Sequence, residues 1–472
     1  DFRQVMASVA IIGQATSRAE LDYLLTPFVD SSRLRVILEK LVDSRFMMYN
    51  RQSRTYSLHP IDRDYALSNT PTGTPDEPEN TFTRYTLNHR MAEYYRSRRT
   101  PRDTWKSLDD LEAVLREMTH RFNAGDYDGV ADILLEIDFP YLIPWGYVQL
   151  MQTWHSKLEG NIRHFNTARR SIGNLGTAYS IMGNNEEAII RYEKAIQMAQ
   201  EQGNRAGERG PLGNLGLTYA NMGKLELAIN YYEQALAIDR ETDYKVGESI
   251  RLGNLGNAYA ELGDFEKGIA YLQQALEVAK QANDGSGESR HSTNWGYALG
   301  GQGKFSEAMP LIQNGLEIAQ KINSARDTHY SLAFLAQTYW YLGDYTNALT
   351  VIKQARDYDA AFINHAVMVW HGCIAWCSGL ADEAQAIFHE TLAYTEKTQP
   401  KSYDRFYIRA LAYAGLWIAT GDMRYHADAL KMYADAKALC GYAGILQYNR
   451  RSLETLLACG DKDGSALIAI LQ

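Results

Sequence analysis

Cysteine is scarce in this chain of 472 residues, and its four cysteines lie at positions 373, 377, 440 and 459. None of the spacings is that of a disulfide framework, so the sequence fits a reducing compartment and we expect a cytoplasmic protein. Cys373 and Cys377 are one helical turn apart, near His365 and His371. A structural zinc site usually joins such a pair to a second, distant pair. We therefore expect buried core thiols and no metal site.

Long apolar runs and an excess of positive charge are also missing. No stretch reaches the roughly 18 consecutive apolar residues of a membrane helix, so no membrane partner is expected. The formal net charge of −9 argues against nucleic acid as a partner, because lysine and arginine bind phosphate backbones. One arginine cluster stands out, at Arg96, Arg98, Arg99 and Arg102. It is interpreted as a solvated helix end, with a phosphate or acidic-partner site as the alternative.

Catalytic motifs are missing as well. The sequence has no G-x4-G-K-[ST] phosphate loop, no nucleophile elbow and no H-E-x-x-H metal motif. The nearest similarity to a phosphate loop, at 300–304, is followed by Phe305 where serine or threonine would hold magnesium. We therefore expect no catalytic residue, no metal, no cofactor and no enzymatic activity in this chain.

A repeat with a step of 40 residues organises most of the sequence. Gly-Asn-Leu-Gly occurs at 173–176, 213–216 and 253–256, and divergent copies stand at 293–296 and 333–336. In the first copy, Gly176 lets a neighbouring helix approach closely, and Tyr179 lies on the same helical face. Gly183 then ends the helix, where a left-handed cap favours glycine. A second helix follows, with its packing stripe at Ala188, Tyr192 and Ala195.

This pattern resembles the tetratricopeptide repeat (TPR), in the long-helix variant of kinesin light chains. The resemblance is most specific over 165–355 and implies a mainly α protein, an α-solenoid of helical hairpins. We expect five regular units over 161–360, then divergent hairpins and a C-terminal cap over 361–472. The extra residues of each unit include a Gly-Glu pair, as at 207–208, which we expect to form a turn and then the first turn of the next helix.

The resemblance also implies a binding groove. In these repeats the first helix of each pair lines the concave surface, and an asparagine holds the backbone of a bound peptide. The matching positions here are Asn174, Asn214, Asn254 and Asn294. Arg170 and Arg290, one turn earlier, would add selectivity for acidic ligands. The alternative is that the asparagines bind neighbouring parts of the protein and stiffen the superhelix. Aromatic residues in the fifth unit would form an anchor pocket or belong to the core, namely Tyr330, Trp340 and Tyr341.

The first 70 residues predict a winged-helix domain. A helix starts after Thr16 and Ser17, a second runs from Arg33 to about Arg45, and two strands follow at 46–49 and 55–58. Leu-His-Pro-Ile-Asp-Arg-Asp-Tyr-Ala-Leu comes next, at 58–67. This segment resembles the winged-helix module of STAND ATPases of the NB-ARC type, where a TPR sensor often follows. The resemblance implies that His59 is a latch for bound nucleotide in a longer parent; the alternative is a structural histidine.

The remaining N-terminal part predicts a proline- and threonine-rich flexible linker at 71–82 and a helical bridge at 83–160. We expect a piece of a longer signalling or defence protein, in which an upstream nucleotide-binding domain makes the parent an ATPase. A peptide or protein trigger in the groove would drive a ligand-triggered oligomer of that parent. Two alternatives stay open, a constitutive TPR adaptor and a transcription regulator that places its winged helix on DNA.

Overall fold

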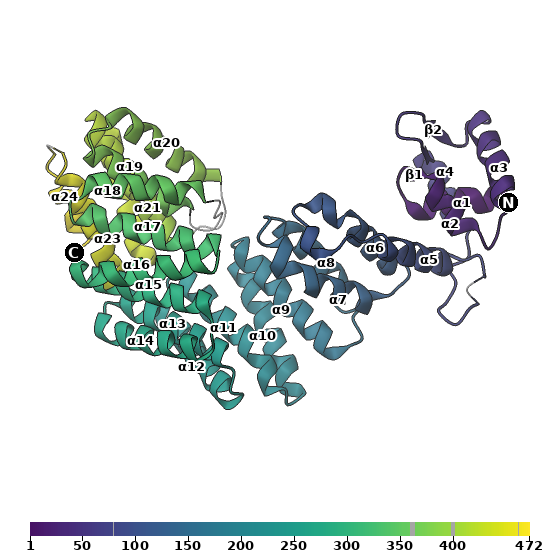
Figure 1. The fold of residues 1–472 in the computed structure, drawn as a ribbon. Coiled ribbons are helices and arrows are strands. Elements are labelled where there is room, and N and C mark those ends of the chain that lie inside the picture. Colours follow the sequence, from purple (N-terminus) through teal and green to yellow (C-terminus); the bar gives the residue numbers. More distant parts are fainter. Residues whose placement is uncertain (79, 359–363, 398–401, 461) are drawn as a thin grey trace. The chain divides into compact units, whose positions relative to one another are not determined.

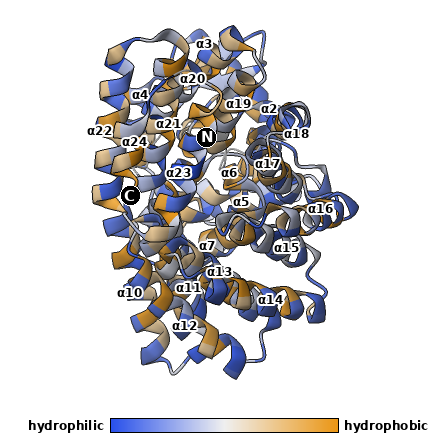
Figure 2. Cartoon of the chain, turned by 90° about the vertical axis from the view of Figure 1, so that its left-hand side faces the viewer, coloured by the Kyte–Doolittle hydropathy of each residue, from blue (hydrophilic) through white to orange (hydrophobic). Residues whose placement is uncertain are grey.

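The computed structural model describes residues 1–78, 80–358, 364–397, 402–460 and 462–472, and Glu79 of the predicted linker lies outside them. The chain divides into two compact units, 1–174 and 175–472, which are treated separately below. Helices dominate both units (Figure 1), as the predicted fold class requires. Polar and apolar residues are mixed along the helices (Figure 2). Among the described residues, no helix combines the length and hydropathy of a membrane-spanning segment.

The first unit begins with a small three-stranded sheet and the helices around it. These elements are α1 (Phe2–Ile12), β1 (Thr16–Ser17), α2 (Arg18–Leu25), α3 (Ser31–Asp43), β2 (Met48–Asn50), β3 (Thr55–Ser57) and α4 (Pro60–Ser68). The sheet is antiparallel, with the strand order β1-β3-β2. Helix α2 starts with the predicted cap, because Ser17 and Glu20 satisfy each other's backbone amides.

Helix α1 was not predicted from the sequence. Its last six residues, 7–12, are all buried, so it has no polar face there that would reveal a helical period. Its apolar residues share one core with α2, α3 and α5 (Arg84–Ser97), which contributes Leu87 and Met91. The described part of the predicted linker is fastened to the start of α5, because the amides of Arg84 and Tyr85 donate to the carbonyls of Pro71 and Thr72.

The remainder of the first unit is helical, as the predicted bridge requires. Its helical elements are two 3-10 turns (η1, Arg102–Thr104, and η2, Leu108–Leu111), α6 (Glu112–Asn123), α7 (Tyr127–Ile137), a π-helical turn (Asp138–Leu142), α8 (Val148–Leu158) and the first part of α9 (Phe165–Ile181). The turn between α6 and α7 resembles those of the later repeats. Gly125 has a φ of 78° and Asp126 caps α7.

The helices from 165 to 357 follow the 40-residue step. They are α9, α10 (Asn185–Glu201), α11 (Arg205–Asn221), α12 (Leu225–Glu241), α13 (Lys245–Leu262), α14 (Phe265–Gln281), α15 (Gly285–Gly301), α16 (Phe305–Lys321), α17 (Ala325–Tyr341) and α18 (Tyr345–Asp357). Gly183 and its equivalents all have a positive φ, between 73° and 99°. The close packing predicted at Gly176 is present, because a Cβ atom there would lie 2.9 Å from the ring of Tyr192.

The Gly-Glu pairs lie entirely inside the helix, whereas the prediction placed the turn within the pair. Gly207 and Glu208 are both inside the first turn of α11, and the turn itself is formed by the residues before Arg205. Gly203 takes the left-handed conformation there, with a φ of 62°. The predicted helix-dipole role of Glu208 is compatible with this position, since the carboxylate lies near the helix N-terminus.

The curvature of the second unit follows from its helix contacts. Each first helix packs on the first helix of the next repeat, as α13 does on α15 and α15 on α17, whereas the second helices α12, α14 and α16 make little contact with one another. The first helices are therefore the more closely spaced layer and form the concave side.

Two divergent hairpins extend the array, as predicted from the glycines at 379 and 421. They are α19 (Asn364–Cys377) with α20 (Ala381–Lys397), and α21 (Tyr403–Thr420) with α22 (Met423–Leu439). The predicted C-terminal cap takes a different course. Helix α23 (Ala443–Leu457) turns back along the concave side and contacts α13, α15, α17, α19 and α21, while α24 (Ser465–Ile470) packs on α22.

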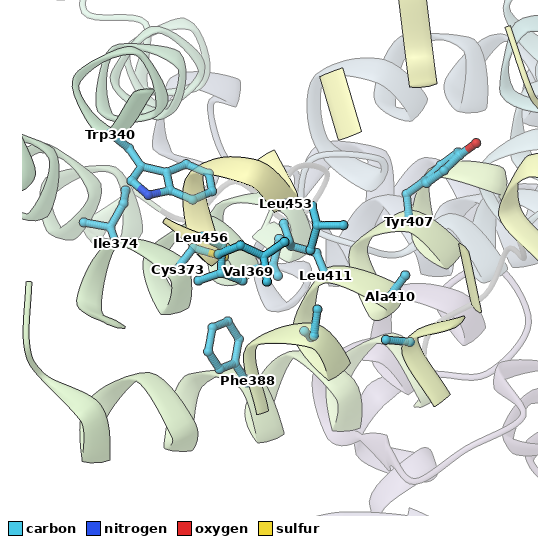
Figure 3. Packing of buried hydrophobic residues seen from close by; sticks show 14 of the residues in the cluster. Trp340, Val369, Cys373, Ile374, Phe388, Tyr407, Ala410, Leu411, Leu453 and Leu456 are labelled. Carbon is cyan, nitrogen blue, oxygen red and sulfur yellow. The ribbon is translucent and has the colours of Figure 1, made fainter. Parts of the chain in front are cut away.

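The return of α23 corrects the prediction for the cysteines. Cys377 at the end of α19 and Cys459 just after α23 form a disulfide, although 82 positions separate them. Spacing along the sequence could not reveal this pair, since only the course of α23 brings the two together. Cys373 and Cys440 are buried free thiols. Figure 3 shows Leu453 and Leu456 of α23 packed among Val369, Cys373 and Leu411.

Candidate ligand-binding site

The concave side of the second unit carries a stripe of polar and aromatic side chains from successive first helices. It follows the predicted asparagine position and the helical turn on either side of it. The term inner wall is used below for these residues: Asn214, Asn254, Arg290, Asn294, Tyr297, Tyr330, Phe334 and Trp370. The wall is polar on α11 and α13, mixed on α15, and aromatic on α17 and α19.

Two asparagines of the wall connect successive first helices. The Asn214 amide nitrogen lies 3.3 Å from the hydroxyl oxygen of Thr177 and donates to it. The Asn294 amide oxygen accepts a hydrogen bond of 2.6 Å from the hydroxyl of Tyr330. Asn294 is only 8% exposed. These contacts agree with the alternative interpretation, in which the asparagines stiffen the superhelix.

Asn254 differs from its neighbours in the ladder. It is partly exposed, and among the described residues its side-chain amide has no hydrogen-bond partner. An asparagine amide offers two donors and one acceptor, which matches the polar groups of a peptide bond. Asn254 is therefore the ladder position best able to bind the backbone of a ligand, which stays a prediction.

The first asparagine of the ladder belongs to the first unit. The Asn174 amide nitrogen donates to Asp138, at 2.8 Å between nitrogen and carboxylate oxygen, and Arg170 one turn earlier is exposed. Asp138 thereby takes up the amide donor that a ligand would need. In the second unit, Arg290 lies 3.8 Å from the carboxylate of Asp327, which reduces the positive charge it presents.

His59, the predicted nucleotide latch, is exposed at the start of α4. Its ring nitrogen Nδ1 accepts a hydrogen bond of 3.4 Å from the Ile61 amide, so it caps the helix. The exposed side chain is compatible with either of the two predicted roles.

Aromatic rings form the second half of the inner wall. Tyr297 and Phe334 are 4.6 Å apart between ring centroids, Tyr330 and Phe334 are 4.7 Å apart, and Phe334 and Trp370 are 5.7 Å apart. Phe334 occupies the place of the asparagine in the fifth repeat, and all four residues are partly exposed. Such a row favours apolar or aromatic side chains of a ligand.

The three aromatic residues singled out in the fifth repeat have separate roles. Tyr330 belongs to the wall, whereas Trp340 is fully buried and part of the core. Tyr341 lines a narrow pocket together with Tyr297, Phe334 and Tyr448. An anchor pocket for a ligand at these residues stays a prediction, and Tyr448 of α23 is the lining residue that the repeat pattern could not supply.

Buried polar pairs lie behind the wall. The imidazole Nε2 of His291 is 2.9 Å from the hydroxyl of Ser249, and burial lowers the pKa of His291 to about 4. Gly253 makes room for this imidazole, since a Cβ atom there would lie 2.3 Å from it. Burial raises the pKa of Asp239, although the guanidinium of Arg251 lies 3.5 Å away and opposes the shift.

One carboxylic acid beside α23 has an unusual proton affinity. Burial raises the pKa of Glu261 to about 7, although the hydroxyl of Tyr403 donates a hydrogen bond to it at 3.3 Å. The negative charge of Asp404 also favours the protonated form of Glu261.

A buried Ser-His-Asp arrangement in the first unit was not predicted. His155 lies 2.7 Å from the hydroxyl of Ser171 through Nδ1 and 2.7 Å from the carboxylate of Asp138 through Nε2. These three residues are at most 2% exposed, so the serine hydroxyl offers a substrate no approach. The residues come from the π-helical turn, α8 and α9, and no spacing in the sequence marks them as partners. Their contacts define a structural network.

No group of three or more histidine, cysteine, aspartate or glutamate side chains is arranged to hold an ion within the described ranges. Of the two predicted core thiols, Cys373 is free and buried, whereas Cys377 is bonded to Cys459.

Known family models match the regular repeats. A family model described as tetratricopeptide repeat matches residues 166–241, 209–281 and 248–321, and a second model of that description matches 331–361. These regions are tetratricopeptide repeats, as the sequence predicts. No curated protein has a matching sequence.

Solved structures with low sequence identity to this chain include the following three proteins. A Signal Transduction ATPase with Numerous Domains (STAND) with a tetratricopeptide repeat sensor, from Pyrococcus horikoshii, has 13% identity and a TM-score of 0.51 over 93% of this chain. The match covers 63% of that protein's length. A Rap protein complexed with competence and sporulation factor has 15% identity and a TM-score of 0.49, over 75% of this chain and 98% of the other. A putative kinesin light chain from Podospora anserina has 20% identity and a TM-score of 0.35, over 42% and 98%.

Proposed function

We propose that this chain is the ligand-sensing and protein-interaction part of a STAND-type signalling or defence ATPase, and that a peptide or protein trigger binds along the inner wall. The observation that carries the proposal is the position of Asn254. Its amide, which has no partner in the described part of the chain, lies in the wall's polar half, and the aromatic row from Tyr297 to Trp370 continues along the same face. One face thus offers both backbone and side-chain contacts to an extended ligand.

The N-terminal unit supports the link to a nucleotide switch. The order helix, strand, helix, helix, strand, strand, with the sheet order β1-β3-β2, supports the proposal of a winged-helix domain. His59 stands at the start of α4, inside the segment that resembles the NB-ARC type, and is exposed. In a longer parent this histidine would be available to a nucleotide on an upstream domain.

The wall alone would bind a ligand weakly. A hydrogen bond to Asn254 contributes a net ~0.5–1.5 kcal/mol, so most of the affinity must come from buried aromatic contacts. A trigger acts as a switch only if it binds one conformation of the parent better than the other. We infer that it favours an assembling ATP-bound form over a closed ADP-bound monomer.

The DNA-binding alternative has less support in this structure. Arg33 pairs with Asp1 and Arg35 pairs with Glu39, so part of the positive charge of α3 is neutralised. A constitutive adaptor remains the main alternative. A phosphate loop encoded upstream of Asp1 would favour the switch, and its absence would favour the adaptor.

The asparagine prediction can be tested with peptides selected from a random library displayed on phage. Asn254→Ala should weaken the binding of selected peptides by roughly 2–10-fold at an unchanged melting temperature. Asn294→Ala is the matched control at the same repeat position, and it should lower the melting temperature because Tyr330 loses its acceptor. Selected peptides that bind the Asn254→Ala variant as tightly as they bind the unsubstituted chain would contradict the proposal.

A further inference from the structure

Helix α23 lies on the concave side in the manner of a bound ligand. The segment from Cys440 to Cys459 meets the ends of the first helices in their order along the array. The thiol of Cys440 is 3.7 Å from the carbonyl oxygen of Gly223 after α11, and Ala443 packs beside Gly263 after α13. The segment ends at the disulfide with Cys377 of α19. One helix therefore contacts several repeats in turn, as a peptide in the groove would.

Tyr448 is the aromatic anchor of this helix. Its ring stacks on Tyr297, with 4.3 Å between centroids, and meets the edge of Phe265 at 5.9 Å. Its hydroxyl donates to the backbone carbonyl of Tyr297 at 3.3 Å. The socket depends on Gly301, because a Cβ atom there would lie 2.6 Å from the Tyr448 hydroxyl. A buried aromatic ring in a fitted socket is typical of a binding hot spot.

The polar contacts of α23 go to backbone groups at the end of α15. Arg451 donates to the carbonyl oxygens of Gly300 and, at 3.1 Å, of Gly301, and Gln447 donates to the Gly301 oxygen at 2.8 Å. The last carbonyls of a helix have no partner within it and lie at the negative end of its dipole. Arg451, one turn after the aromatic anchor, donates hydrogen bonds to these carbonyls and places a positive charge at the negative end of the dipole.

The neighbouring arginine provides an internal comparison. The side chain of Arg450 is 42% exposed and pairs with Glu454 on its own helix. Arg451 therefore binds the end of α15, whereas Arg450 pairs within α23. The recognised pattern is an aromatic residue, an arginine three positions later, and leucines at 453 and 456 that enter the core.

We propose that the surface under α23 is a docking site for an amphipathic helix with an aromatic residue and an arginine three positions later, and that α23 is its resident occupant. This inference rests on the proposed function and names the class of partner. A helix with this pattern would replace α23 and gain the socket at Gly301 and the carbonyls of α15.

The Cys377–Cys459 bond is the covalent fastening of the resident helix. A dithiol reductant cleaves it by two successive exchanges, which leave two protein thiols and the oxidised, cyclic reductant. Reduction removes the tether but leaves the non-covalent contacts of α23 in place. Exchange of α23 for another helix should therefore be possible only in the reduced chain.

The test uses a synthetic peptide of residues 441–458, which contains no cysteine. The full chain with Tyr448→Ala and Cys459→Ser has a weakened resident helix and no tether. Fluorescently labelled peptide should bind this variant and raise its melting temperature. The unsubstituted chain with its disulfide intact should not bind the peptide. Tyr448→Ala in the peptide should weaken binding at least about tenfold, as should Arg451→Ala, whereas Arg450→Ala should not.

Amide hydrogen exchange gives an independent reading that does not need the double variant to fold. In the unsubstituted chain, reduction of the Cys377–Cys459 bond should speed amide exchange in α23 at least about tenfold relative to α15. If α23 stays as protected as α15 after reduction and no variant binds the peptide, α23 is a fixed part of the core and the proposal is wrong. If the 441–458 peptide binds but Asn254→Ala does not weaken the binding of library peptides, only the proposed ligand-binding role of Asn254 is wrong.

Discussion

The rings of Tyr297 and Tyr448 are stacked at 4.3 Å between centroids, with 9° between their planes. The first belongs to a repeat helix, and the second follows it by 151 positions. This pair fixes α23 to the concave side, and it places the aromatic anchor beside the row formed by Phe334 and Trp370. The C-terminal segment is therefore part of the surface that the repeats present.

Two adjacent glycines at the end of α15 should respond in opposite ways to alanine. A Cβ atom at Gly301 would lie 2.3 Å from the ring of Phe265, so Gly301→Ala should cost about 1–3 kcal/mol of unfolding free energy. At Gly300 the nearest atom is 3.7 Å away, so Gly300→Ala should stabilise the helix by roughly 0.5–1 kcal/mol. Urea unfolding of both variants measures the difference. Equal effects would contradict the described socket.

Acid should destabilise the protein between pH 6.5 and pH 4. Burial lowers the pKa of His120, His291 and His371 to about 4, from an ordinary value of 6.5. In this window the unfolded chain binds more protons than the folded chain, so stability is full above pH 6.5 and decreases as the pH falls. We expect His291→Gln to lessen this loss, and the exposed His389→Gln to leave it unchanged. Thermal unfolding of each variant at pH 7 and pH 5 provides the measurement.

Glu261 should act in the opposite direction. Its pKa is about 7 in the folded chain, against an ordinary value of 4.5. The folded form therefore holds the extra proton, and this contribution to stability is full below pH 4.5 and is lost as the pH rises to 7. Glu261→Gln should raise the melting temperature at pH 8 and have less effect at pH 5. Glu233→Gln, at an exposed carboxylate, serves as the control, and a shift of equal size in it would refute the assignment.

The buried network of the first unit should be structural. His155→Ala removes a hydrogen-bond partner from the buried carboxylate of Asp138, which keeps only the Asn174 amide, and should cost about 1–3 kcal/mol. His164→Ala should change little, because that side chain is 75% exposed. Circular dichroism during thermal unfolding compares the two. A fluorophosphonate probe should not label Ser171, since a labelled serine would mean that substrates reach it.

The repeat array was predicted in detail because its information is local. The glycine at each left-handed turn, such as Gly183 or Gly263, and the small residue that meets the second helix, such as Gly176, recur with the repeat. Helix bounds and nearest neighbours follow from this period. Helix α1 was missed for the complementary reason, since its buried end shows no period.

The asparagine ladder shows how far this local information extends. The period places Asn214, Asn254 and Asn294 at equivalent points of successive helices. It does not determine their partners, because Asn294 meets Tyr330 only where the fifth repeat carries a tyrosine, while Asn254 has no such neighbour in the described structure. Which amide is available to a ligand thus depends on the residues of the adjacent repeat.

The sequence by itself determined the helices of the regular repeats, their pairing and the glycine turn within each pair. Tertiary structure alone decided the return of α23, the disulfide between Cys377 and Cys459 and the network around His155. The physical reason is that neighbouring repeats interact through residues at a fixed step. The course of α23 depends instead on the accumulated curvature of the array, to which every repeat adds a small rotation.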